Sequence, residues 1–172
     1  MKTKLISWDI DGTMVLRTDP QIYRRNCLEL LAEAPKTPLI EGIEEAMKTA
    51  KESGIVQGVV SDYAYQFAMN ILTSTKARDY IDSRLIFLAN KYAWEGMVLD
   101  DKNYDAVLGE YAKPSPKMLE LSQIRASEIL QQSINPQDCM YIGNESKDEQ
   151  IADAAGWNFL HITHLPDFGK CL

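Results

Sequence analysis

Short apolar runs alternate with amphipathic stretches along this chain. Five runs have the length and composition of buried strands, at residues 4–8, 55–61, 84–89, 139–143 and 157–163. Between them, apolar residues recur every three or four positions, which is the spacing of a helix that buries one face. Strands that alternate with helices pair in parallel through right-handed crossovers. The pattern therefore predicts an α/β fold, a doubly wound three-layer α/β/α sandwich around a mainly parallel sheet.

The amphipathic stretches place the predicted helices at residues 20–34, 38–54, 63–75, 115–132 and 146–156. Pro20 suits the first turn of a helix, whereas Gly54 and Gly156 suit helix ends. The stretch 115–132 fits one helix or two. Residues 90–112 hold tyrosines, a tryptophan and several acidic residues without a clear period, so their secondary structure is not assigned.

The composition is that of one globular domain. The chain has 172 residues, of which 45% are hydrophobic and 25% charged, and it shows no repeat or interdomain linker. A net charge of −7 argues against general binding of nucleic acid, whose phosphates attract basic surfaces. No apolar run approaches the ~18 residues of a membrane span. Three cysteines without a secretory signal predict reduced thiols in a cytoplasmic protein.

Polar residues with chemical potential follow several of the predicted strands. Asp9 ends the first strand, Ser61 ends the second, and Asn144 follows the fourth. Ligands of open parallel sheets bind at the carboxyl ends of the strands, so we expect these residues to meet there. Asp9 and Asp11 stand two positions apart, and two such carboxylates repel each other unless a positive group lies between them.

Four segments resemble, in order, the four motifs of the haloacid dehalogenase-like superfamily. They are DIDGT (9–13), VVSD (59–62), KPSP (113–116) and YIGNESKDEQIADAAGW (141–157). The KPSP form resembles that of the phosphoglycolate-phosphatase-like members. The resemblance spans residues 6–157. It implies a Rossmann-like core and a Mg²⁺-dependent phosphomonoester hydrolase that acts on a small phosphorylated substrate.

The same resemblance implies a role for each matching residue. Asp9 is the expected nucleophile, which forms an aspartyl-phosphate, and Asp11 is the expected general acid and base. Gly12, Ser61, Asp62 and Lys113 are expected to contact the substrate phosphate, with Ser61 and Lys113 also counted as catalytic. Lys117 is a rival for the lysine role, which the KP pair assigns to Lys113.

Magnesium is expected to be held by Asp9, Asp11, Asn144 and Asp148. Asp11 would contribute its backbone carbonyl, and Asp148 would act directly or through water. The superfamily usually has aspartate where this chain has Asn144, so we expect a weaker affinity for Mg²⁺. Glu145 stands beside it and could contribute.

Substrate choice in this superfamily usually comes from cap insertions. We expect one catalytic domain over residues 1–172. Within it, we expect a short cap-like insertion at about 14–38 and a flap at about 90–112. Two alternatives stay open: a catalytically weak phosphate-binding or interaction module, which Asn144 motivates, and a phosphomutase, which would need a larger cap to exclude water. Tyr63 and Tyr65 are candidates for the mouth of the site, and the sequence leaves the oligomeric state and the substrate open.

Overall fold

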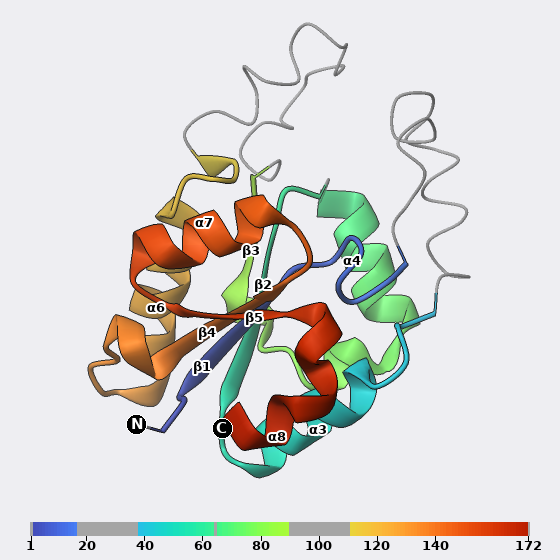
Figure 1. The fold of residues 1–172 in the computed structure, drawn as a ribbon, viewed down its shortest axis with the longest axis horizontal. Coiled ribbons are helices and arrows are strands. Elements are labelled where there is room, and N and C mark those ends of the chain that lie inside the picture. The colour runs from blue at the N-terminus through green and yellow to red at the C-terminus, as the bar shows by residue number, and fades with distance from the viewer. Residues whose placement is uncertain (1, 17–37, 64, 90–110, 172) are drawn as a thin grey trace, which may run out of the picture.

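A five-stranded parallel sheet forms the centre of the molecule (Figure 1). The computed structural model describes residues 2–16, 38–63, 65–89 and 111–171, and the fold is given for these. The strands are β1 (Leu5–Trp8), β2 (Val56–Ser61), β3 (Ile86–Leu88), β4 (Cys139–Gly143) and β5 (Asn158–His161), in the order β3-β2-β1-β4-β5. Each neighbouring pair is parallel. The predicted α/β fold is confirmed.

The helices connect these strands in sequence. They are α3 (Ile43–Glu52), α4 (Tyr65–Ser74), α6 (Lys117–Leu130), α7 (Ser146–Ala155) and α8 (Phe168–Cys171). Short 3₁₀ helices lie at η2 (Lys76–Asp79), η3 (Ser83–Leu85), η6 (Pro136–Asp138) and η7 (Ile162–Asp167). The chain passes from β2 to β3 on one side of β1 and from β4 to β5 on the other, so the strand order reverses beside β1. This reversal is where open α/β sheets bind their ligands.

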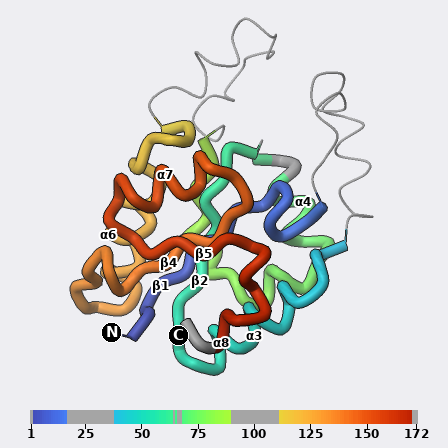
Figure 2. The backbone as a smooth tube through the Cα atoms, in the orientation of Figure 1, coloured from blue at the N-terminus to red at the C-terminus, as the bar shows by residue number. Residues whose placement is uncertain are grey.

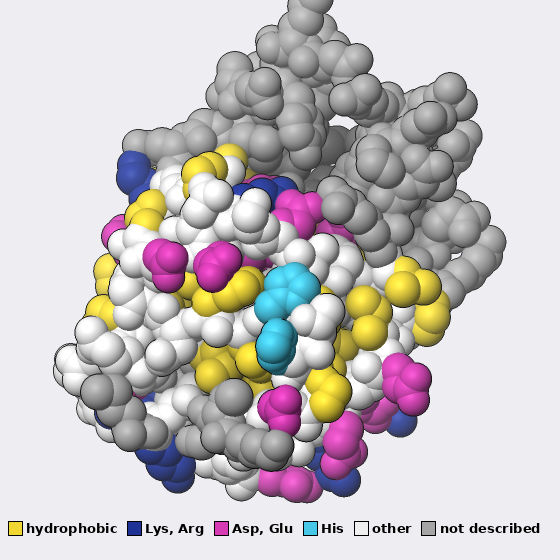
Figure 3. Space-filling model, in the orientation of Figure 1, with side chains coloured by type: hydrophobic (Ala, Val, Ile, Leu, Met, Phe, Trp, Pro, Cys, Tyr) yellow, Lys and Arg dark blue, Asp and Glu magenta, His cyan; other side chains and the backbone are white. Residues whose placement is uncertain are grey.

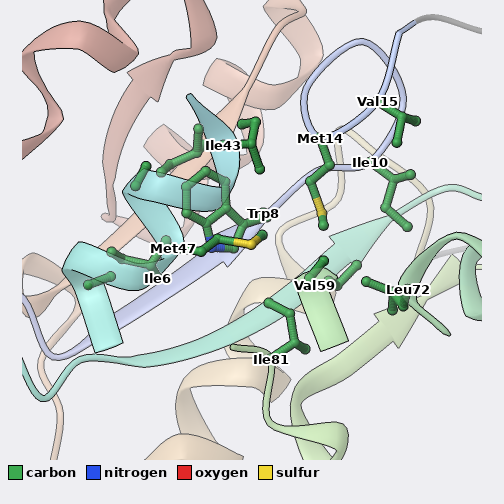
Figure 4. Close-up of a cluster of buried hydrophobic side chains, with 14 of the residues drawn as sticks. Ile6, Trp8, Ile10, Met14, Val15, Ile43, Met47, Val59, Leu72 and Ile81 are labelled. Carbon is green, nitrogen blue, oxygen red and sulfur yellow. The ribbon is translucent and has the colours of Figure 1, made fainter. Parts of the chain in front are cut away.

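Two hydrophobic clusters cover the two faces of the sheet. In β1, Ile6 and Trp8 face the cluster that includes residues of α3, α4 and α8, and Leu5 faces the cluster formed with α6 and α7. Figure 4 shows Trp8 beside Ile43 and Met47 of α3. The tube in Figure 2 shows α3 and α8 side by side on the same side of the sheet. Both faces are thus buried, which explains why the strands are rich in apolar residues on both sides.

One helix boundary differs from the prediction, and one choice that the sequence left open is settled. The helix expected from residue 38 begins at Ile43, because Gly42 adopts a left-handed backbone with φ of 87° and the regular turns start only after it. The stretch 115–132 forms one helix, α6, rather than two. Gly156 ends α7 with φ of 71°, as predicted. The short α8 follows a 3₁₀ turn and was missed by the helical pattern.

Several predictions fall outside the described residues. The helix expected at 20–34 lies there, as do most of the cap-like insertion at 14–38 and of the flap at 90–112. These three remain predictions. Among the described helices, none is long and apolar enough to cross a membrane.

Candidate active site

Asp9 lies at the carboxyl end of the central strand, between the ends of β2 and β4. Its backbone N–H continues the sheet by donating to the carbonyl of Ile142, at 2.9 Å. The side chain is buried, and its Oδ1 accepts a hydrogen bond from Lys113 Nζ at 2.6 Å. The other oxygen, Oδ2, lies 3.5 Å from the hydroxyl of Thr13. The lysine therefore fixes one oxygen of Asp9, and the other faces the DIDGT loop.

Lys113 joins two buried carboxylates. Its Nζ lies 2.6 Å from Asp9 Oδ1 and 2.7 Å from Asp148 Oδ1, and it faces the ring of Tyr141 at 5.3 Å from the ring centre. Burial alone would lower the pKa of Lys113, but the two carboxylates outweigh it and raise the pKa above its ordinary value. The structure thus places Lys113 beside Asp9, and its role toward the substrate stays a prediction. The rival Lys117 instead lies over the ring of Tyr111, at 5.5 Å.

The same trio sets the protonation of Asp9. Burial raises the pKa of its carboxyl group to about 6; Lys113 opposes this shift, and the charge of Asp148 adds to it. Ser61, which ends β2 and is buried, hydrogen-bonds to Asp9 and favours its ionised form. The contacts with Lys113 and Ser61 thus favour the ionised form of Asp9, which is the form that a nucleophile requires.

Asp148 anchors the loop that follows β4. Its Oδ2 accepts the backbone N–H groups of Asn144 and Glu145, each at 3.0 Å, and its Oδ1 faces Lys113. This places Asp148 in a capping box at the start of α7. A Cβ added at Gly143 would stand 2.5 Å from the Cβ of Asp148, so only glycine leaves room for this buried carboxylate.

Asn144 lies opposite the DIDGT loop. Its Oδ1 accepts a hydrogen bond from Thr13 Oγ1 at 3.1 Å, and its backbone carbonyl lies 3.0 Å from Nε2 of His161 at the end of β5. Gly12 has φ of 72°, and a Cβ there would collide with the Asn144 amide. The left-handed turn at Gly12 therefore lets the two loops approach each other.

Asp11 is held from the loop that follows β2. The hydroxyl of Tyr63 donates to Asp11 Oδ1 at 3.0 Å, and the backbone N–H of Tyr63 lies 3.4 Å from Ser61 Oγ. Tyr63 is 2% exposed, so it is packed beneath the site rather than at its mouth. Tyr65, at the start of α4, is 41% exposed.

Asp62 and Lys147 link the loops above the buried trio. Asp62 Oδ1 accepts the backbone N–H of Lys113 at 3.1 Å, next to the cis peptide bond between Lys113 and Pro114. Lys147 Nζ lies 3.5 Å from Asp62 and 3.2 Å from Glu145. Figure 3 shows basic and acidic side chains next to each other where α7 begins. These contacts tie the loops after β2 and β4 to the loop that carries Lys113.

The donor chemistry suits a hard cation. Asp9 Oδ2 and Asn144 Oδ1 both face the Thr13 hydroxyl, and oxygen donors are what Mg²⁺ prefers. Among the described residues, no three His, Cys, Asp or Glu side chains converge on one point. Of the four residues expected to hold the ion, Asp9 and Asn144 share the Thr13 hydroxyl. The carboxylate of Asp11 accepts from Tyr63, and Asp148 is engaged by Lys113 and the α7 N-terminus.

Sequence reasoning missed three contributors to this site. Thr13 closes the DIDGT motif, but we assigned it no role, and it bridges Asp9 and Asn144. Tyr141 donates its hydroxyl to the Val60 carbonyl at 2.8 Å and supports the Lys113 pocket from β4. Gly143 makes room for Asp148. The alternation of side chains along a strand could have placed Tyr141 on the sheet face that α6 and α7 cover. It could not have predicted the hydrogen bond from the Tyr141 hydroxyl to Val60.

Comparison with known proteins finds similarity in structure but not in sequence. No family model and no curated protein matches the chain. Among solved structures, a Lactobacillus plantarum protein provisionally assigned as a phosphoglycolate phosphatase matches with a TM-score of 0.63 and 14% identity, over 99% of this chain and 89% of that one. CbbY from Rhodobacter sphaeroides matches with a TM-score of 0.61 and 14% identity, over 92% and 85%.

A third structure gives the same result. A HAD-superfamily hydrolase of subfamily IA from Geobacter sulfurreducens matches with a TM-score of 0.57 and 17% identity, over 91% of this chain and 85% of that one. At such identities the likeness concerns the fold. The chain therefore has the Rossmann-like fold of the haloacid dehalogenase-like hydrolases, matched over nearly its whole length.

Proposed function

We propose that this protein is a Mg²⁺-dependent phosphomonoester hydrolase that works through an aspartyl-phosphate on Asp9. The observation that carries the proposal is the buried Asp9–Lys113–Asp148 arrangement at the point where the strand order reverses. Two solved structures of CbbY, a neighbour in fold, support the substrate class: one is a complex with phosphate, and the other is a variant in complex with xylulose-1,5-bisphosphate. A small phosphate monoester is the substrate class proposed here.

In the first step, a carboxylate oxygen of Asp9 attacks phosphorus while the bond to the leaving alcohol breaks. Lys113 holds Oδ1 of Asp9 at 2.6 Å, so the carboxylate is fixed in one orientation for the attack. Lys113 and the Ser61 hydroxyl would bind phosphoryl oxygens and offset the charge that gathers on them. Because the lysine is fixed by two carboxylates, it needs little rearrangement when the substrate arrives.

Asp11 would complete both halves of the reaction. Its carboxyl group protonates the leaving alcohol, and its carboxylate then takes a proton from the water that hydrolyses the aspartyl-phosphate. Tyr63 already holds one of its oxygens. Gly12 and Asp62 would serve the phosphate site, Gly12 through the turn of its backbone and Asp62 by holding the backbone of Lys113.

Asp9, Asn144 and the backbone carbonyl of Asp11 would hold Mg²⁺. When bound, the ion would neutralise part of the charge on Asp9 and on the phosphate. Asp148 would act on it indirectly, because its oxygens already accept from Lys113 and from two backbone N–H groups. Asn144 supplies an amide oxygen without a full charge, so we expect a low affinity for the ion.

Phosphate release from an aryl phosphate tests the proposal. We expect turnover in Mg²⁺, its loss in EDTA, and a rate near zero for Asp9→Asn. The control is Asp153→Asn, the same change at an exposed position on α7. Activity that survives Asp9→Asn would show that Asp9 is not the nucleophile.

Asn144 favours one second candidate, a phosphate-binding module with little catalysis. In that case the wild-type chain would bind phosphate without releasing it from an ester, and Asn144→Asp would restore Mg²⁺ binding. A titration with Mg²⁺ followed by the aryl phosphate assay separates the two functions.

A further inference from the structure

Tyr63 connects the two loops that carry the proposed nucleophile, the proposed acid and the phosphate-binding serine. It follows Ser61 by two residues, yet its hydroxyl reaches across to Asp11 on the loop after β1, at 3.0 Å. Its ring belongs to the hydrophobic cluster between the sheet and α3, α4 and α8. A ring packed in this way has little freedom, so its hydroxyl is a fixed donor.

We propose that Tyr63 is a positioning residue that orients the Asp11 carboxyl group for proton transfer to the leaving alcohol. This inference rests on the proposed phosphatase function. Asp11 itself is partly exposed, and an exposed carboxylate samples several rotamers. The bond from Tyr63 selects the rotamer that keeps Oδ1 against the core.

The direction of this hydrogen bond also determines which oxygen carries the proton. A tyrosine hydroxyl that donates to Oδ1 makes that oxygen an acceptor, so the transferable proton of the acid form is directed to Oδ2. In the first step, the bond from Asp9 to phosphorus forms and the bond from phosphorus to the ester oxygen breaks. The Oδ2 proton of Asp11 moves to that ester oxygen, which leaves as the neutral alcohol. Water then attacks phosphorus and gives a proton back to Asp11, while the bond between phosphorus and the Asp9 oxygen breaks. This step releases inorganic phosphate and restores the Asp9 carboxylate.

A purely structural role for Tyr63 predicts something different. Loss of packing or of loop order would lower the rate for every substrate by the same factor. Loss of a positioned acid would lower the rate only where the leaving group needs a proton. A p-nitrophenolate leaves without one, whereas an alkoxide does not. The dependence on leaving group therefore distinguishes the two roles.

The test compares kcat/KM for p-nitrophenyl phosphate and for a simple alkyl phosphate in the wild type and Tyr63→Phe. This ratio reports the step in which the leaving group departs. We expect Tyr63→Phe to lower kcat/KM for the alkyl phosphate by about tenfold more than for the aryl phosphate, the effect of one hydrogen bond to a reacting group. Tyr80→Phe removes the same hydroxyl from a residue after η2, whose ring lies under Lys51, and should change neither value.

A double-substitution cycle makes the test stricter. In an Asp11→Asn background, Tyr63→Phe should have no further selective effect, because no acid remains to be positioned. Equal losses for both substrates, or no loss for either, would overturn the positioning role while the proposed phosphatase function stands. A folded wild type that hydrolyses neither substrate would overturn the proposed function and, with it, this role.

Discussion

Replacing Asp148 with asparagine tests how the site is held together. The two carboxylate oxygens receive donors from both sides: Lys113 Nζ at 2.7 Å on Oδ1, and two backbone N–H groups at 3.0 Å on Oδ2. An asparagine has one accepting oxygen, and its NH₂ group can only donate. Its oxygen can accept from Lys113 or from the two backbone N–H groups, but not from both. The NH₂ group then faces the donors that remain.

The size of the effect follows from the number of donors left unpaired. If the amide oxygen keeps Lys113, the N–H groups of Asn144 and Glu145 lose their acceptor beside a side chain that is 0% exposed. Each unsatisfied buried donor costs about 1–3 kcal/mol, so we expect Asp148→Asn to lower the free energy of unfolding by about 3 kcal/mol. For a chain of this length, that corresponds to a fall in Tm of about 6–12 °C.

Urea unfolding in EDTA measures this value without a contribution from bound metal. The matched control is Asp153→Asn, which makes the same change at an exposed position of the same helix and should stay within about 0.5 kcal/mol of the wild type. If Asp148→Asn also stays within about 0.5 kcal/mol, then Asp148 does not anchor this loop and the reasoning is refuted.

Three further predictions concern the same region and the sheet below it. Gly143→Ala should lower the free energy of unfolding by about 2 kcal/mol and abolish phosphate release, because the new Cβ would stand 2.5 Å from the Cβ of Asp148. The control is Gly169→Ala, where an added Cβ would meet nothing within 4 Å beyond its chain neighbours. Asn144→Asp should raise the affinity for Mg²⁺ by about tenfold or more in calorimetric titration, since a carboxylate adds a full charge to the donor set; an unchanged affinity would place the ion elsewhere. Burial raises the pKa of the Cys139 thiol to about 12 from its usual 9.0, so iodoacetamide should label it slowly at pH 8 unless urea is added. Because this pKa is raised in the folded state, burial of the neutral thiol contributes to the free energy of unfolding fully below pH 9. The contribution is lost as the pH rises towards 12. Urea titrations at pH 8 and pH 10 should therefore show a lower stability at pH 10.

The sequence predicted the sheet well because both of its faces are buried. The runs at 4–8 and 139–143 are mostly apolar, and they form β1 and β4, which pair with each other in the sheet. Parallel pairing brings the carboxyl ends of such strands to one edge, so the meeting of Asp9, Ser61 and Asn144 followed from topology alone. The prediction failed at Gly42, where a positive φ delays the start of α3, because the periodicity of side chains carries no information on that turn.

The contacts that hold the site were less predictable. The KP pair indicated Lys113, but its second carboxylate partner, Asp148, depends on how deeply α7 packs behind β4. The reach of Tyr63 to Asp11 and of His161 to the Asn144 carbonyl links residues far apart in sequence. Such contacts depend on the angles between loops, which hydrophobic patterns do not determine. The contacts of Thr13 were also missed, although it stands within the DIDGT motif and the motif could have indicated them.

The most direct test of the central claim is to trap the proposed intermediate. The protein would be mixed with an alkyl or aryl phosphate in Mg²⁺ and quenched with borohydride, which reduces an aspartyl-phosphate to homoserine, and the site of reduction would be located by peptide mass spectrometry. We expect reduction at Asp9 that depends on the substrate and is absent in Asp9→Asn. Phosphate release without reduction at Asp9, or with reduction at another carboxylate, would contradict it.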